Sequence, residues 1–376
     1  MPEAQLIGIP VRELETPVLL VNLDAMERNL DRMAENLEGT GVKLRAHGKT
    51  HKSPYLARKQ IARGAVGVCC QKVSEAEVMA EGGVENILVS SEVVSASKLR
   101  RLAALTRHTK RLVVVDHPKG AEMLSAAMKA VGSEIGVLVD VDVGQGRCGV
   151  LPGAPAVELA QRVDRLSGLH LRGIQAYQGT AQHVEGFDVR MNVNAEAIGK
   201  MKKIVSDFGA SGLSADVRSG GGTGTWRWDV EAGVLNELQA GSYLFMDSHY
   251  GRIGGEKGPV YDDFEPSLFV LTTVVSTPTN DRVIVDAGQK ALASDSGLAP
   301  CIELEGAEHV KASDEHGVLQ LSSEARRPEL GETLLFQPSH CDPTINLYDA
   351  YYGIRGGMEE GALETIIPVA ARGRVW

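Results

Sequence analysis

The chain has 376 residues, a formal net charge of −10 and 43% hydrophobic residues, which is the composition of a globular enzyme. The negative charge disfavours nucleic acid or an anionic membrane as a partner, because either would need a basic face on the protein. No apolar run approaches the roughly 20 residues that a transmembrane helix needs. We therefore expect a small-molecule substrate, no nucleic acid and no membrane.

The first residues and the cysteines bear on the compartment. Met1-Pro2-Glu3-Ala4 lacks the basic and apolar regions of a secretory signal, which predicts a cytoplasmic protein. The five cysteines form no CxxC pair, and their odd number argues against a disulfide framework and against a thiolate zinc site. We expect the cysteines to be reduced.

The larger part of the chain alternates between strand and helix patterns. A buried strand over 16–21 and a helix over 22–37 come first. Eight strands then follow in succession: Val42–Ala46, Val66–Cys70, Asn86–Ser90, Arg111–Val115, Ile135–Asp142, Leu169–Tyr177, Asp216–Ser219 and Glu237–Tyr243. Helical patterns separate most of them: Ser53–Gly64, Ser74–Gly82 with a capping box from Ser74 to Glu77, Ala96–Thr106, Pro118–Val131, Ala154–Leu166 and Val189–Phe208. This rhythm predicts an α/β protein with a (β/α)₈ TIM barrel, and a doubly wound open sheet is the alternative.

From about Asp263 onward, β-branched runs replace the helical periodicity. Strand-sized segments cover Leu268–Ser276, Val283–Asp286, Gly317–Leu321, Thr333–Gln337 and Leu363–Val369. They predict a β-rich domain over 263–376 that follows a barrel domain over 16–262. Residues 1–15 are expected to pack with the β-rich domain.

Lys49 follows the first barrel strand, at the position where α/β proteins commonly place their chemistry. Arg45, His51 and Lys52 lie close to it in the sequence. Cationic neighbours lower the pKa of a lysine toward the neutral amine that attacks a carbonyl group. A solvated basic loop is the alternative interpretation.

In a barrel, the loops after successive strands line one face, and this chain has its glycine-richest stretch after the seventh strand. Barrels commonly bind phosphate near this point, because glycine lets backbone N–H groups close on an anion. The alternative is a tight turn that requires positive φ. The expected cofactor-binding residues near these loops are Tyr177, Ser219, Gly221, Gly222, Thr223, Gly224 and Tyr243.

The sequence Gly144-x-Gly146-x-x-Gly149 has the form of the dinucleotide-binding fingerprint. It follows the fifth barrel strand, whereas the fingerprint belongs to the first βα turn of its unit. Pro152-Gly153 also interrupts the chain before the next helix. An NAD-binding oxidoreductase would depend on this match alone, so we reject that interpretation.

His340 and Asp342 place an imidazole and a carboxylate two residues apart. On an extended segment both would point to the same side and could bind one metal ion. Imidazole and carboxylate, completed by water or substrate oxygens, suit Mn²⁺ or Mg²⁺. A surface hydrogen bond is the alternative, and Asp314-Glu315-His316 is a second cluster with the same ambiguity.

Taken together, five motifs resemble one family. These are His47–Lys52, Cys69–Ala76, Gly144–Gly149, Gly220–Gly224 and His340–Thr344. From Thr16 to Arg372 the chain resembles the D-threonine aldolase and 3-hydroxy-D-aspartate aldolase group of fold type III pyridoxal-phosphate enzymes. The resemblance implies an alanine-racemase-like barrel, a C-terminal β domain and a homodimer.

The resemblance also implies pyridoxal 5'-phosphate and a divalent metal as cofactors. Lys49 matches the Schiff-base lysine, Arg147 the arginine at the pyridine nitrogen, and His183 the catalytic histidine. His340 and Asp342 match the metal ligands. The implied reaction is retro-aldol cleavage of a D-3-hydroxy amino acid to glycine and an aldehyde or glyoxylate.

Two other activities on this scaffold stay open. Related D-serine dehydratases carry His-x-Cys at the metal position, so Asp342 favours the aldolase over a dehydratase. A non-catalytic pyridoxal-phosphate carrier would need only the barrel, which the long C-terminal domain disfavours. The side chain of the substrate, methyl or carboxylate, is not decided. Arg252, Arg355 and Gln71 are the candidates for substrate contact, and either arginine could bind a side-chain carboxylate.

Overall fold

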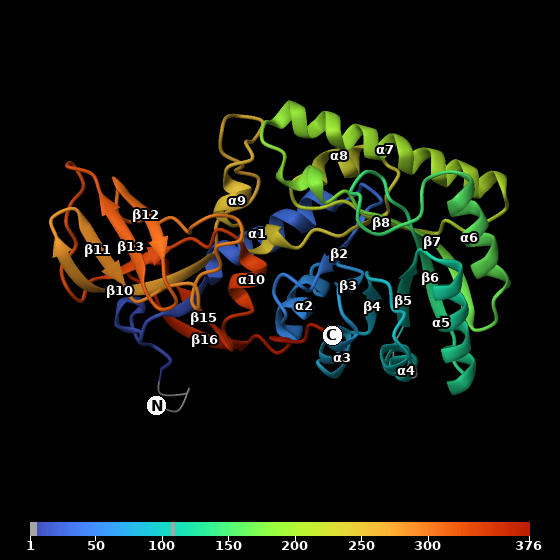
Figure 1. The fold of residues 1–376 in the computed structure, drawn as a ribbon, viewed down its shortest axis with the longest axis horizontal. Coiled ribbons are helices and arrows are strands. Elements are labelled where there is room, and N and C mark those ends of the chain that lie inside the picture. Colours follow the sequence, from blue (N-terminus) through green and yellow to red (C-terminus); the bar gives the residue numbers. More distant parts are fainter. Residues whose placement is uncertain (1–5, 107–109) are drawn as a thin grey trace. The chain divides into compact units, whose positions relative to one another are not determined.

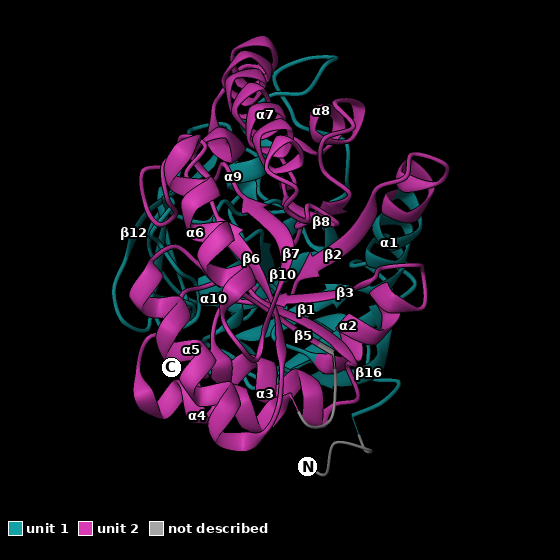
Figure 2. Ribbon diagram, turned by 90° about the vertical axis from the view of Figure 1, so that its right-hand side faces the viewer, with its two compact units in different colours: residues 1–32, 50–53, 242–373 teal, residues 33–49, 54–241, 374–376 magenta. Residues whose placement is uncertain are grey.

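The structure, a computed structural model, describes residues 6–106 and 110–376 (Figure 1). The chain divides into two compact units (Figure 2). The barrel unit contains Met33–Lys49, Pro54–Gly241 and Arg374–Trp376, and the sheet unit contains the described part of Met1–Arg32 together with Thr50–Ser53 and Ser242–Gly373.

Eight parallel strands close the barrel in sequence order. They are β2 (Lys43–His47), β3 (Gly67–Cys70), β4 (Asn86–Val89), β5 (Lys110–Val115), β6 (Ile135–Asp140), β7 (Leu169–Ala176), β8 (Val217–Gly220) and β9 (Glu237–Leu238). The circle is completed where Lys43 and Leu44 of β2 pair with Glu237 and Leu238 of β9. The predicted TIM barrel is confirmed.

Helices follow the strands, as the sequence periodicity predicts. They are α2 (Pro54–Ile61), α3 (Val73–Glu81), α4 (Ala96–Leu105), α5 (Pro118–Val131), α6 (Ala154–Arg165), α7 (Phe187–Ala210) and α8 (Trp226–Glu231), with the 3₁₀ turn η3 (Thr180–His183) before α7. Helix α8 occupies the connection in which no helix was predicted. Alternate strand residues face opposite sides: Cys69, Leu88 and Leu138 belong to an interior cluster, while Val68 and Ile87 pack with the helices.

Two local predictions in the barrel unit are wrong. The last strand ends at Leu238 rather than Tyr243, because Ser242–Leu244 forms the 3₁₀ turn η4. Helix α3 begins at Val73, so Ser74 lies inside its first turn and is not the N-cap. The carboxylate of Glu75 instead accepts hydrogen bonds from the backbone N–H groups of Gln71 (2.8 Å) and Lys72 (3.1 Å). Both donors precede the helix, so the hydrogen bonds to Glu75 stabilise the N-terminus of α3.

The sheet unit is built on a mixed sheet with the order β12-β13-β11-β10-β1-β15-β16, and β14 pairs with β10. The strands are β1 (Val18–Asn22), β10 (Leu268–Thr279), β11 (Arg282–Val285), β12 (Ala307–Ala312), β13 (Gly317–Leu321), β14 (Thr333–Phe336), β15 (Ala350–Arg355) and β16 (Ala362–Pro368). Strand β1 pairs antiparallel with β10 and parallel with β15. The units therefore differ from the expected ranges 16–262 and 263–376, because the first strand belongs to the C-terminal sheet.

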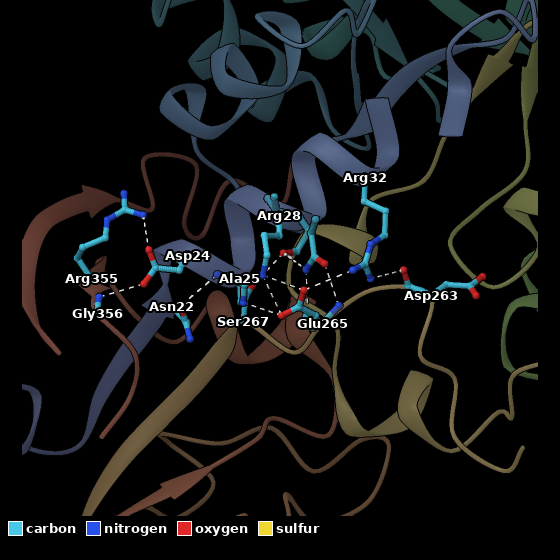
Figure 3. Close-up of polar contacts among 12 residues, drawn as sticks. Asn22, Asp24, Ala25, Arg28, Arg32, Asp263, Glu265, Ser267, Arg355 and Gly356 are labelled. Carbon is cyan, nitrogen blue, oxygen red and sulfur yellow. Dashed lines mark hydrogen bonds and ion pairs between the residues drawn. The ribbon is translucent and has the colours of Figure 1, made fainter. Parts of the chain in front are cut away.

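Helix α1 (Leu23–Leu37) begins directly after β1, and its first turns are tied to the C-terminal segment of the sheet unit (Figure 3). The guanidinium of Arg28 contacts the carboxylate of Glu265 at 2.6 Å, and the Asn29 amide donates to the Glu265 carbonyl at 2.7 Å. Asp24 accepts a hydrogen bond from the backbone N–H of Gly356 at 2.9 Å. These contacts join segments more than 200 residues apart in the sequence.

Among residues 6–106 and 110–376, no helix combines sufficient length with sufficient apolar character to cross a membrane. This agrees with the absence of a long apolar run in the sequence.

Candidate functional site

Lys49 lies just beyond the carboxyl end of β2, where its side chain is half-buried. Its backbone N–H donates to Nδ1 of His47 at 3.4 Å. Nε2 of His47 lies 3.3 Å from the hydroxyl of Ser90, which follows β4, and this hydroxyl donates to the side-chain oxygen of Gln71 after β3 at 3.4 Å. Three neighbouring strands thus place Lys49, His47, Gln71 and Ser90 at the same end of the barrel.

Arg45 does not contribute to this end of the barrel as expected. Its guanidinium makes two 2.6 Å contacts with the carboxylate of Glu237 and donates to Asn86 at 3.0 Å. Arg45 lines a cavity of about 750 Å³ together with Asn86, Ile135 and Glu237, the first residues of β4, β6 and β9. The arginine is therefore neutralised at the opposite ends of the strands from Lys49.

His51 and Lys52, the other two cations expected near Lys49, belong to the sheet unit. Both are buried. The carbonyl of His51 accepts the hydroxyl hydrogen of Tyr351 at 2.5 Å, and the carbonyl of Lys52 accepts the N–H of Ala371 at 2.9 Å. The basic stretch is therefore an ordered segment with tertiary contacts, and the alternative of a solvated loop is wrong.

The glycine loop, Gly220–Gly224, follows β8 and is closely packed. The N–H of Gly224 donates to the side-chain oxygen of Gln182 at 2.8 Å, and that of Gly222 donates to Asp229 at 3.4 Å. A Cβ atom on Gly224 would lie 2.5 Å from the carbonyl oxygen of Gln182. Gly221 has φ +69°, which favours glycine. Both the close approach and the backbone conformation therefore require glycine in this loop.

Asp229, in α8, supports the glycine loop through side-chain hydrogen bonds. Its carboxylate accepts hydrogen bonds from the hydroxyl of Thr225 at 2.6 Å and from the amide of Asn194 at 2.9 Å. Burial raises the pKa of Asp229 to about 6, although the hydrogen bonds from Thr225, Asn194 and Gly222 oppose this rise. Sequence reasoning missed Asp229 because no helix was predicted there.

The remaining barrel-unit candidates also lie at or beyond the carboxyl ends of strands. Ser219 is buried and its hydroxyl accepts a hydrogen bond from Gln239 at 2.9 Å. Thr223 is buried, whereas Tyr177 after β7 and His183 in η3 are half-buried. The barrel topology therefore gathers these residues, together with Lys49, on one end. Tyr243 lies in η4 of the sheet unit, fully buried against Phe264.

The segment Gly144–Gly149, after β6, contains the exposed Arg147. Asp142 accepts hydrogen bonds from the backbone N–H groups of Gly144 (2.9 Å) and Gly146 (3.1 Å). Burial opposes ionisation of Asp142, but these hydrogen bonds outweigh it and lower the pKa of the carboxyl group. Gly144 and Gly146 thus belong to a turn whose backbone N–H groups bind the Asp142 carboxylate, in agreement with the rejection of a dinucleotide site.

A second polar group in the barrel unit was not predicted. Glu92, Asp116 and Cys148 each place one potential ligand atom within 4.8 Å of the others. Burial, followed by the two carboxylates, raises the pKa of the Cys148 thiol to about 11, which disfavours the thiolate that a metal would need. Burial and the nearby Glu92 also raise the pKa of Asp140 to about 8. The carboxyl group of Asp140 accepts a buried hydrogen bond from the side-chain amide of Gln175 at 3.0 Å.

In the sheet unit, His340 and Asp342 occupy different local conformations. His340 is extended and is the N-cap of α10 (Cys341–Ile345), so Asp342 lies in the first helical turn. The prediction of one extended segment is therefore wrong. The Nδ1 atom of His340 lies 2.6 Å from a carboxylate oxygen of Asp295. Burial opposes ionisation of Asp295, but the hydrogen bond from His340 outweighs it and lowers the pKa of Asp295.

Asp247 fixes the backbone beside this histidine. One oxygen of its buried carboxylate caps α9 (Ser248–Gly251) by accepting the N–H of Tyr250 at 2.9 Å, and the other accepts the N–H of Cys341 at 3.0 Å. Burial raises the pKa of Asp247 despite both hydrogen bonds. Of the second predicted cluster, the exposed Glu315 pairs with Lys290 at 2.5 Å.

The two candidate substrate arginines differ in their surroundings. Arg252 is exposed at the end of α9 and donates to the carbonyl of Ser296 at 3.2 Å, next to Asp295. Arg355 forms ion pairs at 2.8–2.9 Å with three carboxylates of the sheet unit, and Figure 3 includes the one with Asp24. Three carboxylate partners leave Arg355 a structural role, so Arg252 is the better candidate.

Comparison with known proteins gives two family matches. Residues 21–249 match the family described as "Alanine racemase, N-terminal domain", and residues 267–354 match a serine dehydratase domain. The 3-hydroxy-D-aspartate aldolase of Paracoccus denitrificans (strain Pd 1222) is 41% identical over 98% of this chain and 94% of that protein. The chain belongs to the family of D-threonine and 3-hydroxy-D-aspartate aldolases. The predicted family is confirmed.

Two further comparisons place the chain within this aldolase family. The crystal structure of D-threonine aldolase from Filomicrobium marinum superposes with a TM-score of 0.94 at 43% identity and covers 98% of both chains. The D-threo-3-hydroxyaspartate dehydratase of Delftia sp. (strain HT23) is only 27% identical, over 94% of this chain and 96% of that protein. The racemase-like barrel and the aldolase family together imply pyridoxal phosphate as cofactor.

Proposed function

We propose that this protein is a pyridoxal-phosphate- and divalent-metal-dependent lyase. It cleaves D-3-hydroxy amino acids of the D-threonine or D-3-hydroxyaspartate type to glycine plus an aldehyde or glyoxylate. The observation that carries the proposal is the grouping of Lys49 with the glycine loop at one end of the barrel, in a chain of the aldolase family. The homodimer and the cytoplasmic location stay predictions.

The groups at the barrel end fit pyridoxal phosphate. The hydroxyl groups of Ser219 and Thr223 suit a phosphate, and the glycines of the loop let its backbone approach one closely. Lys49 supplies the amine for the cofactor aldehyde, and Arg147 supplies a guanidinium for the pyridine nitrogen. When bound, the cofactor supplies an electron sink for the carbanion that C–C cleavage leaves. Arg147 cannot readily give up a proton to the ring nitrogen, so it moderates that sink and limits side reactions.

The metal motif in the sheet unit has a donor set that suits Mn²⁺ or Mg²⁺. His340 offers Nε2, because Nδ1 faces Asp295, and Asp342 offers a carboxylate. A divalent ion held by these residues would lower the pKa of the substrate β-hydroxyl group. In this proposal His183 would serve as the general base that takes the hydroxyl proton, directly or through water. We expect His183→Asn to lose about 10²-fold in kcat with the cofactor still bound, measured by glycine release. A near-native rate would reassign the base.

Arg252 is the residue that we propose binds the side chain of the substrate. Its exposed guanidinium is suited to the carboxylate of D-3-hydroxyaspartate, so this substrate should have a higher kcat/KM than D-threonine. Arg252→Ala should lose about 1.5–3 kcal/mol in transition-state stabilisation for the diacid alone. Arg355→Ala is the matched control and should leave the ratio of the two substrates unchanged. Equal losses for both substrates in Arg252→Ala would contradict the assignment and favour D-threonine.

A dehydratase is the second candidate activity, and the serine dehydratase match over 267–354 is the observation that favours it. The carboxylate of Asp342 at the expected metal position argues for the aldolase. Chelation tests the metal requirement of the proposal: the chelator should stop glycine formation and leave the visible absorbance of the cofactor intact. Full activity of a metal-free Asp342→Ala protein would refute the metal requirement.

A further inference from the structure

Asp295 lies next to the metal motif through contacts made within the sheet unit. The segment around it is tied to the motif by three hydrogen bonds. The hydroxyl of Ser339 donates to the carbonyl of Ala293 at 3.0 Å, the N–H of Ala293 donates to the hydroxyl of Thr344 at 3.3 Å, and the hydroxyl of Tyr348 donates to the carbonyl of Ala291 at 2.8 Å. These contacts on both sides of His340 fix the backbone from which Asp295 projects.

The contact between Asp295 and His340 determines which nitrogen of the imidazole ring carries the hydrogen. The carboxylate oxygen and Nδ1 are 2.6 Å apart, a short hydrogen-bond distance. A carboxylate has no hydrogen to donate, so Nδ1 carries the hydrogen of this contact. In the neutral imidazole the lone pair is then on Nε2. The hydroxyl of Ser296 donates to the same carboxylate oxygen at 3.3 Å and restrains its position.

We propose that Asp295 is a positioning residue for the metal. It holds His340 in the tautomer and the orientation in which Nε2 binds the divalent ion. A carboxylate behind a metal-binding histidine fixes the ring and makes it a stronger ligand, and loss of such a partner typically weakens metal binding by about 10–100-fold. This inference rests on the proposed function, which assigns His340 and Asp342 as the ligands.

A second histidine–carboxylate pair supplies a matched control. Nε2 of His170 lies 2.6 Å from Glu134 on the barrel unit, and both side chains are more than half exposed. In the pair of interest, the His340 side chain is 30% exposed and a second carboxylate, Asp342, follows two residues later. Glu134→Ala therefore removes a pair of equal length at which we propose no metal.

The test is a Mn²⁺ titration of the cofactor-loaded protein, followed by the loss of the free-ion signal in electron paramagnetic resonance. Asp295→Ala should raise the dissociation constant about 10–100-fold. Asp295→Asn, whose amide oxygen can still accept from Nδ1, should fall between Asp295→Ala and the wild type. Glu134→Ala should bind as the wild type does. Unchanged cofactor absorbance and melting temperature will show that each variant is folded.

The outcomes separate this inference from the proposed function. If the wild type binds no Mn²⁺, or if His340→Ala binds as tightly as the wild type, the metal site of the proposed function fails and this inference fails with it. If binding depends on His340 but Asp295→Ala retains wild-type affinity, only this inference is overturned.

A nuclear magnetic resonance measurement on protein labelled with ¹⁵N-histidine tests the tautomer without activity or metal. Long-range ¹H–¹⁵N correlations should show the Nδ1–H tautomer of His340 in the wild type and a larger Nε2–H population in Asp295→Ala. An Nε2–H tautomer in the wild type would overturn the inference.

Discussion

Replacement of Gly224 by alanine tests the role of the glycine loop. A Cβ atom on this residue would lie 2.5 Å from the carbonyl oxygen of Gln182, which is backbone and cannot rotate away. Gly224 is also fastened through both of its backbone polar groups, since its N–H donates to Gln182 at 2.8 Å and its carbonyl accepts from Arg190 at 3.0 Å. The loop must shift to admit the methyl group, and the shift breaks at least one of these hydrogen bonds.

The expected loss follows from these contacts. Overpacking in a closely packed region costs about 1–3 kcal/mol, and a lost hydrogen bond adds about 1 kcal/mol. We therefore expect about 2–4 kcal/mol, divided between the free energy of unfolding and the free energy of cofactor binding. If all of it fell on binding, the dissociation constant of pyridoxal phosphate would rise about 30-fold to 1000-fold.

The assay combines urea unfolding of the apoprotein with a pyridoxal-phosphate titration followed by visible absorbance. Gly199→Ala is the matched control: Gly199 lies in the middle of α7, and among the described residues no atom outside its own helical turn comes within 4 Å of the position that the added methyl group would take. It should leave cofactor affinity unchanged and stabilise the fold by up to about 1 kcal/mol. A Gly224→Ala protein that keeps both quantities within about 0.5 kcal/mol of the wild type would refute the reasoning.

Three further predictions concern the cofactor lysine, the barrel interior and the sheet unit. Lys49→Ala should abolish turnover and the attachment of cofactor by borohydride, and peptide mapping that finds the label on another lysine of the wild type would contradict this. Glu237→Gln should destabilise the protein by about 3–5 kcal/mol in urea unfolding, because it leaves the buried charge of Arg45 unpaired, and a loss below about 1 kcal/mol would be inconsistent with that role. Burial lowers the pKa of His309, so as the pH falls the unfolded chain binds a proton at this residue before the folded protein does, and stability should decrease below about pH 6.5. His309→Asn should therefore flatten the dependence of the unfolding free energy on pH between about pH 7 and 5. An unchanged slope would exclude the effect.

The barrel could be predicted because its signal is local. Alternating apolar residues mark each strand, helical spacing marks each connection, and strand order follows the chain order. The place of β1 could not be predicted in the same way, since its partners β10 and β15 lie about 250 and 330 residues later in the sequence. Strand β15 was missed for a related reason: its Gly353 breaks the β pattern, and its pairing with β1 and β16 supplies the stability.

The site divides in the same way. Residues at or just after strand ends, such as Ser219 and Lys49, could be predicted from the strand count alone. The roles of three other residues could not be predicted. Gln182 and Asp295 each form a hydrogen bond with a residue more than 40 positions away in the sequence. Asp229 depends on helix α8, for which the sequence carries no signal. The conformation of His340 and Asp342 was mispredicted because the N–H of Cys341 is fastened by Asp247, 94 residues earlier.

The most direct test of the proposed reaction is an analysis of its products. The cofactor-loaded protein with Mn²⁺ is incubated with D-3-hydroxyaspartate and, separately, with D-threonine, and glycine, aldehyde or glyoxylate, 2-oxo acid and ammonia are quantified. Retro-aldol cleavage predicts one glycine and one glyoxylate or acetaldehyde for each substrate molecule consumed, without release of ammonia. A 2-oxo acid and ammonia in equal amounts, with no glycine, would contradict the proposal and identify a dehydratase.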